Sequence, residues 1–153
     1  MITQRARRLA ALVLGPFGVA AAWLLWTTDS IRFGRRVMGL ALDAGRRLER
    51  LTQLNLVDRD DLPLSYDQLG HIGLWMTATV LIGVASGLRS PARVVAAVAA
   101  LSLATEIVQP LVAPRRLFEL GDVIANFTGV LAGSTILLTL LVVSQLAGSL
   151  RRA

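Results

Sequence analysis

Residues 122–146 read DVIANFTGVLAGSTILLTLLVVSQL, and after the aspartate at the start they contain no charged side chain. A helix crosses the hydrocarbon core of a membrane with about 20 mainly apolar residues, so this stretch predicts a transmembrane helix. Three more stretches have a similar length and character, at residues 9–26, 70–88 and 94–113. The sequence therefore predicts an all-α fold, a four-helix transmembrane bundle that forms one membrane domain over residues 1–153.

The composition supports a membrane protein. Hydrophobic residues make up 54% of the 153 residues, which is more than a soluble domain of this length usually holds, because its surface must be polar. The absence of cysteine excludes disulfides and thiolate metal sites. The net charge of +6 does not indicate a nucleic-acid partner, because the arginines flank the apolar stretches, as is typical of membrane proteins.

The segment between the first two predicted spans has a helical pattern of its own, over residues 31–54. Its apolar residues recur at helical spacing, and its arginines fall largely on the opposite face: Val37, Ala41, Ala44, Leu48 and Leu51 against Arg32, Arg36, Arg46, Arg47 and Arg50. This pattern predicts an additional amphipathic helix. The helix could lie in the headgroup layer or pack over the mouth of the bundle, and the sequence leaves both open.

An even number of spans puts both termini on one side of the membrane. That side also holds the turn at residues 89–93, and it carries seven arginines and no acid, whereas all ten acids fall on the other side or at the adjoining helix ends. By net charge, we predict that both termini are cytoplasmic and that the protein lies in the cytoplasmic membrane. We expect the first span to be a retained signal anchor, because its apolar run continues past the small residues at 20–22.

Polar side chains inside a membrane are costly, so each one is a candidate functional residue. The candidates occur three or four residues apart near helix ends, or in the loop between the last two spans: Asp67, His71, Glu106, Gln109, Arg116, Asp122 and Asn126. Because the chain crosses the membrane in alternating directions, these residues are all expected at the same membrane face.

Most of these candidates also have a purely structural explanation. Asp67 and Asp122 could each cap a helix, His71 could be an interfacial residue, and Arg116 could contact lipid phosphate. Glu106 is different because it lies about two turns from the end of an apolar helix, where it needs a proton or a partner. Asn126 could supply a hydrogen bond, and Arg115, Arg116 or His71 could supply the charge.

Two glycines on the last predicted span are four residues apart, which lets another helix approach closely. Gly129 and Gly133 share one stripe of that helix with Asp122 and Asn126. We expect this stripe to contact the third predicted span, residues 94–113, and to bring Asn126 toward Glu106.

The identity and spacing of these residues resemble the sequence pattern of the VanZ-like family. The family pattern is Glu-x-x-Gln, an Arg, and then Asp-x-x-x-Asn-x-x-Gly-x-x-x-Gly, which is similar to TEIVQ at 105–109, Arg116, GDVIANFTG at 121–129 and Gly133. Upstream, DQLGH at 67–71 is similar to the family's Asp-Lys-x-x-His motif, with Gln68 in place of Lys. The resemblance covers residues 65–140 and implies a small bacterial multi-pass membrane protein. The family takes its name from a protein associated with resistance to teicoplanin.

The polar face predicts a ligand-binding role, which we expect to involve a membrane lipid or the headgroup of a lipid-linked cell-envelope precursor. Arg116 would contact a phosphate, and Glu106, Gln109 and Asn126 would orient the ligand. Such a role would link the protein to envelope homeostasis or glycopeptide resistance, with a second copy or another membrane protein as a further partner. The sequence assigns no catalytic residue, metal ion or cofactor.

Two other functions remain open from the sequence. Asp67, His71, Glu106 and Asp122 could serve an intramembrane enzyme that acts on a lipid by metal-dependent or acid–base chemistry. Alternatively, the polar residues could only join the helices of a structural or assembly protein.

Overall fold

The computed structural model describes residues 3–26, 64–112 and 118–150, together with isolated positions between 36 and 51. Within these residues the chain forms helices and no strand, which confirms the all-α prediction. The helices are α1 (Gln4–Trp26), α3 (Tyr66–Ala85), α4 (Pro91–Val112) and α5 (Leu120–Leu150). The predicted amphipathic helix at 31–54 lies outside the described residues apart from the isolated positions, and Arg116 lies wholly outside them.

Three helices of the described part are long and apolar enough to cross a membrane, over Asp67–Ala85, Pro91–Val112 and Leu120–Ala147. Helix α1 is not among them, and arginines at positions 5, 7 and 8 occupy its first turns. A first span at residues 9–26 therefore stays a prediction. Large apolar side chains such as Leu111, Leu131 and Val143 are exposed along α4 and α5, as expected for helices whose surroundings are hydrocarbon rather than water.

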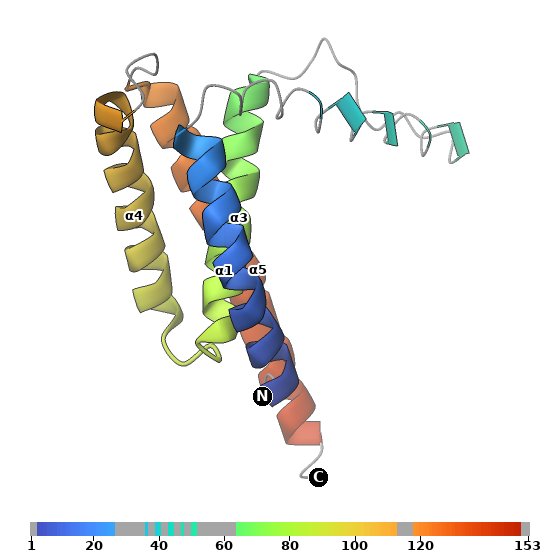
Figure 1. Cartoon of the computed structure of the whole chain (residues 1–153). Coiled ribbons are helices and arrows are strands. Elements are labelled where there is room, and N and C mark those ends of the chain that lie inside the picture. The colour runs from blue at the N-terminus through green and yellow to red at the C-terminus, as the bar shows by residue number, and fades with distance from the viewer. Residues whose placement is uncertain are drawn as a thin grey trace.

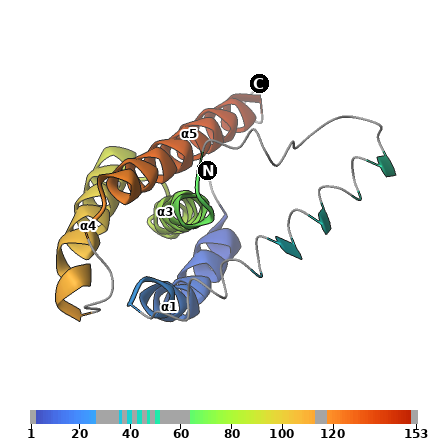
Figure 2. The same cartoon turned by 90° about the horizontal axis from the view of Figure 1, so that it is seen from above.

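The helices alternate in direction along the chain. The start of α1, the turn between α3 and α4, and the end of α5 lie at one end of the bundle, and the start of α3, the end of α4 and the start of α5 lie at the other (Figure 1). Seen from above, α3 lies between α1 and α5 (Figure 2). Its most extensive contact is with α5, and it also packs against α1 and α4. The second end of the bundle holds the six polar candidates that the structure describes, because each of them lies near one of these three helix ends.

Local sequence sets both ends of α3. Ser65 is the N-cap and forms a capping box with Gln68. The alternative in which Asp67 caps this helix is therefore excluded, since Asp67 lies inside its first turn. The helix is followed by a turn in which Gly87 and Leu88 have positive φ angles of 72° and 57°, and Pro91 then begins α4.

The glycine stripe of α5 packs against α3. A Cβ atom at Gly129 would overlap the backbone carbonyl oxygen of Ile72, and one at Gly133 would lie 2.8 Å from the backbone oxygen of Met76. The expectation that this stripe contacts the third predicted span, the present α4, is therefore wrong for the two glycines, whereas Asn126 on the same stripe does bond to Glu106 of α4. The stripe identifies a face of α5 that admits a close neighbour, but it does not identify the neighbour.

Candidate functional site

A buried chain of hydrogen bonds joins α3, α4 and α5 near the second end of the bundle. The amide of Asn126 donates from Nδ2 to Glu106 Oε1 over 2.9 Å, and its Oδ1 lies 2.7 Å from Nδ1 of His71. His71 Nδ1 also lies 3.4 Å from Glu106 Oε1. All three side chains are at least 96% buried. The predicted approach of Asn126 to Glu106 is thus confirmed, and His71 and Asn126 lie at the same end of the bundle.

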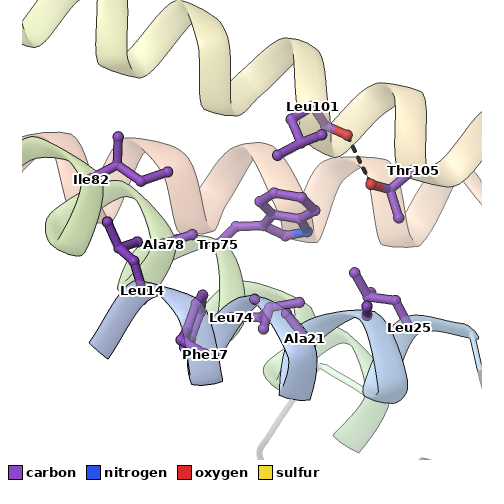
Figure 3. Close-up of a pocket in the computed structure, with 12 residues that line it drawn as sticks. Leu14, Phe17, Ala21, Leu25, Leu74, Trp75, Ala78, Ile82, Leu101 and Thr105 are labelled. Atoms are coloured by element: carbon purple, nitrogen blue, oxygen red, sulfur yellow. Dashed lines mark hydrogen bonds between the residues drawn. The ribbon is translucent and has the colours of Figure 1, made fainter. Parts of the chain in front are cut away.

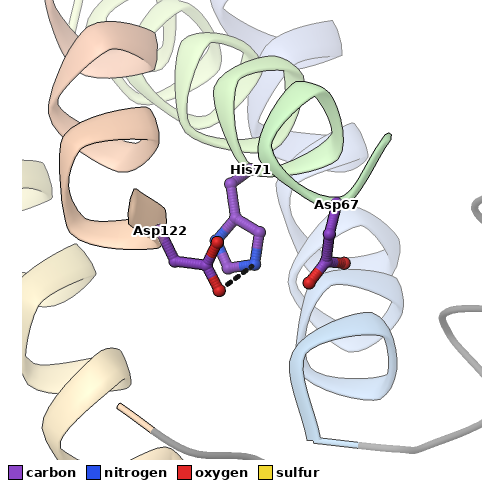
Figure 4. Close-up of side chains that lie close together, drawn as sticks. All are labelled: Asp67, His71 and Asp122. Carbon is purple, nitrogen blue, oxygen red and sulfur yellow. Dashed lines mark ion pairs between the residues drawn. The ribbon is translucent and has the colours of Figure 1, made fainter. Parts of the chain in front are cut away.

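The other ring nitrogen of His71 faces two carboxylates. Its Nε2 lies 3.8 Å from Asp122 Oδ2, and the ligand atoms of Asp67, His71 and Asp122 all lie within 4.8 Å of one another. Figure 4 shows the imidazole between the two carboxylates, with Asp67 and His71 on α3 and Asp122 on α5. Asp122 is buried, whereas Asp67 is exposed. We name these five residues the His71 cluster: Asp67, His71, Glu106, Asp122 and Asn126.

Helix ends influence the charges in this cluster. Asp67 and Asp122 lie in the first turns of α3 and α5, where the helix dipole favours a negative charge. Glu106 lies in the second half of α4 and lacks that support. Its Oε1 accepts from Asn126, but its buried Oε2 has no hydrogen-bond partner among the described residues. The cluster therefore holds one carboxyl group whose hydrogen-bonding capacity is only partly used.

Gln109 is buried one turn after Glu106 but takes a separate role. Its Nε2 donates to the backbone oxygen of Leu25 over 2.6 Å, near the end of α1. The bond therefore ties α1 to α4, and Gln109 is not joined to the His71 cluster by any bond between described residues. Arg116, the remaining predicted site residue, lies outside the described part of the chain.

Replacing Gln109 with Leu should destabilise the packing of α1 on the bundle. The substitution leaves the backbone carbonyl of the buried Leu25 without its donor, and an unsatisfied buried acceptor costs about 1–3 kcal/mol. We expect a fall of that size in the free energy of unfolding, measured by titration with sodium dodecyl sulfate in mixed micelles. Gln145→Leu is the control because Gln145 is exposed on α5. Equal stability of the two variants would contradict the role given to Gln109.

An apolar cavity of about 220 Å³ lies between α1, α3 and α4. Figure 3 shows the indole of Trp75 among its lining side chains, with Leu14, Phe17, Ala21 and Leu25 from α1. The buried Nε1 of Trp75 has no hydrogen-bond partner among the described residues. Sequence reasoning did not single out Trp75 or the cavity. Trp75 follows His71 by four residues and so lies on the same face of α3, which is the signal that could have drawn attention to it.

Among the comparisons with known proteins, a family model gives a match. The family model described as VanZ/LLP1 matches residues 9–142, a range that includes the His71 cluster and every residue that lines the cavity. No curated protein and no solved structure matches the chain.

Proposed function

The chain belongs to the VanZ/LLP1 family, which confirms the resemblance drawn from residues 65–140, and from this premise we propose that it binds a membrane lipid or a lipid-linked precursor of the cell envelope. The headgroup is held at the His71 cluster, and part of the hydrocarbon chain enters the apolar cavity. Family membership and three apolar helices make the chain a VanZ-like membrane protein, so amphiphiles are the molecules that surround it.

The observation that carries this proposal is that the lining of the cavity comes within one helical turn of the His71 cluster on α3 and α4. Trp75 lines the cavity and lies one helical turn from His71, and Thr105 lines it beside Glu106. Leu25 also lines the cavity, and its carbonyl is held by Gln109. An apolar cavity of about 150 Å³ already binds benzene, so one of about 220 Å³ takes a segment of hydrocarbon chain. The polar cluster suits the headgroup of a lipid, and the apolar cavity suits part of its hydrocarbon chain.

Several polar side chains of the protein are available to bind the headgroup of the ligand. The exposed Asp67 lies at the open edge of the cluster, and the partly satisfied carboxyl of Glu106 lies deeper. Arg116, six residues before Asp122 in the sequence, supplies the guanidinium that suits a phosphate. Gln109 contributes indirectly, because its bond to Leu25 fixes the wall of the cavity.

The protein acts in the cytoplasmic membrane, with α1 as a fourth span and both termini in the cytoplasm. A C-terminal reporter that is active only in the cytoplasm tests this orientation. Binding the headgroup of a lipid-linked wall precursor would change how much of that precursor is accessible to a glycopeptide antibiotic. This connects the proposal to teicoplanin-type resistance and to envelope homeostasis.

Filling the cavity should release the lipid. Gly18 lines the cavity, and a Cβ atom there meets nothing within 4 Å, so Gly18→Leu puts a larger side chain at the cavity wall without a backbone clash. We expect native mass spectrometry of the purified protein to show that retained lipid falls about tenfold, equivalent to about 1.4 kcal/mol. Gly15→Leu is the matched control, because Gly15 is on the same helix, has equally open space and does not line the cavity.

The headgroup contacts are tested separately. Arg116→Ala should lower retention of phosphate-containing lipids, and Glu106→Gln should change which lipids are retained while keeping an oxygen that accepts from Asn126. Identical lipid retention by the wild type, Gly18→Leu and Arg116→Ala would contradict the proposal and leave the structural or assembly role. Hydrolysis of the retained lipid by the wild type but not by Glu106→Gln would instead establish an enzyme.

A further inference from the structure

The open edge of the His71 cluster has the spacing of a metal site. Tetrahedral Zn²⁺ bonds of about 2.1 Å place the ligand atoms about 3.4 Å apart. His71 Nε2 and Asp122 Oδ2 are 3.8 Å apart, which is too far for a hydrogen bond but close to that ligand spacing. The carboxylate of Asp67 lies within 4.8 Å of both groups.

The hydrogen bond on the far side of the ring orients His71 for metal binding. Asn126 donates its Nδ2 to Glu106, so its amide oxygen faces His71 Nδ1. An amide oxygen only accepts, and Nδ1 must therefore carry the proton. In the neutral ring the lone pair is then on Nε2, which faces the carboxylate of Asp122. Metal-binding histidines are usually held in this way, with the second ring nitrogen donating to an acceptor.

The position beside Nε2 is suited to a cation. A lone pair directed toward two carboxylates is electrostatically unfavourable, and a metal ion at this position removes the repulsion. A divalent ion also neutralises the two carboxylates, whose charges are costly next to hydrocarbon. One imidazole and two carboxylates suit a first-row transition ion better than Mg²⁺, which prefers oxygen ligands alone.

The three ligands are held by rigid elements. Asp67 and His71 are one turn apart on α3, and Asp122 lies in the first turn of α5. The close contact of Gly129 with Ile72 fixes these two helices against each other. Two of the three side chains are buried and the third is exposed, which gives an ion a path into the site.

We propose that Asp67, His71 and Asp122 bind a divalent transition-metal ion such as Zn²⁺, oriented by Asn126. Three protein ligands leave the fourth position of a tetrahedral ion open for water or for an oxygen of a bound molecule. The site stands on these side chains alone and does not depend on lipid binding.

The test uses the full chain in detergent, with any affinity tag removed. The protein is treated with a chelator, equilibrated with Zn²⁺ and desalted, and the bound metal is measured by inductively coupled plasma mass spectrometry. We expect stoichiometric Zn²⁺ that excess Mg²⁺ does not displace. Co²⁺ in its place should give the intense visible bands of a tetrahedral ion. Because loss of a residue that merely orients a ligand already costs about 10–100-fold in metal affinity, Asp67→Asn and Asp122→Asn should each weaken Zn²⁺ at least tenfold.

The controls separate this site from other acids and from lipid binding. Glu119→Gln removes an exposed acid near the start of α5 whose charge also acts on Asp122, so it should lower the Zn²⁺ affinity far less than Asp67→Asn does. Asp67→Asn keeps the test valid if Asp122→Asn fails to fold, because Asp67 is exposed. Zn²⁺ bound equally by Asp67→Asn and Glu119→Gln, or no bound Zn²⁺ in the wild type, would overturn the proposal. Lipid retention by Gly18→Leu is a separate measurement, so either proposal can fail without the other.

Discussion

Gly129→Ala should destabilise the bundle by about 1–3 kcal/mol or more, the usual cost of inserting a carbon atom where there is no room for it. The added Cβ would overlap the backbone oxygen of Ile72 and would lie 3.0 Å from its Cα. These are backbone atoms of a helix, so they cannot rotate away, and α3 and α5 must separate. The free energy of unfolding in mixed micelles, measured by titration with sodium dodecyl sulfate, should fall accordingly.

The matched control is Gly73→Ala on α3. A Cβ at Gly73 meets nothing within 4 Å, so this variant gains the helix propensity of alanine, about 1 kcal/mol, without a clash. Gly133→Ala should resemble Gly129→Ala, because its Cβ would lie 2.7 Å from Cβ of Thr79. Should Gly129→Ala be as stable as Gly73→Ala, the close packing of α5 on α3 would be disproved.

Much of the candidate site could be predicted because helix direction and spacing follow from the sequence. An even number of passes between His71 and Asn126 brings them to one end of the bundle, and they are in contact. The need of Glu106 for a partner in an apolar helix predicted its bond to Asn126. These inferences use only the cost of polar groups in hydrocarbon and the alternation of the chain.

The lateral arrangement of the helices could not be predicted in the same way. The stripe that holds Gly129 and Gly133 shows which face of α5 allows another helix to approach closely. The sequence does not show whether that helix is α3 or α4. The cavity was equally hidden, because it arises where small residues of two different helices meet, such as Gly18 and Ala22 on α1 and Ala78 on α3. The volume of a cavity depends on how side chains from separate helices pack against one another, and no local sequence pattern predicts that packing.

Asn126→Leu should be the most destabilising change within the site. Leucine has a similar size but removes the donor to Glu106 and the acceptor for His71. Both partners are almost fully buried, and each buried hydrogen-bonding group left unsatisfied costs about 1–3 kcal/mol. We expect a decrease of this size in the free energy of unfolding, measured in the same mixed micelles.

The controls show whether this loss comes from the buried network rather than from any polar change on α5. Thr128→Val removes an exposed hydroxyl whose one bond within the described part of the chain is to Ile124 O on its own helix, so its effect should be small. Glu106→Gln keeps an acceptor for Asn126 and should be far milder than Asn126→Leu. If Asn126→Leu and Thr128→Val are equally stable, the bonds from Asn126 do not hold α3, α4 and α5 together, and the orientation of His71 on which metal binding depends loses its support.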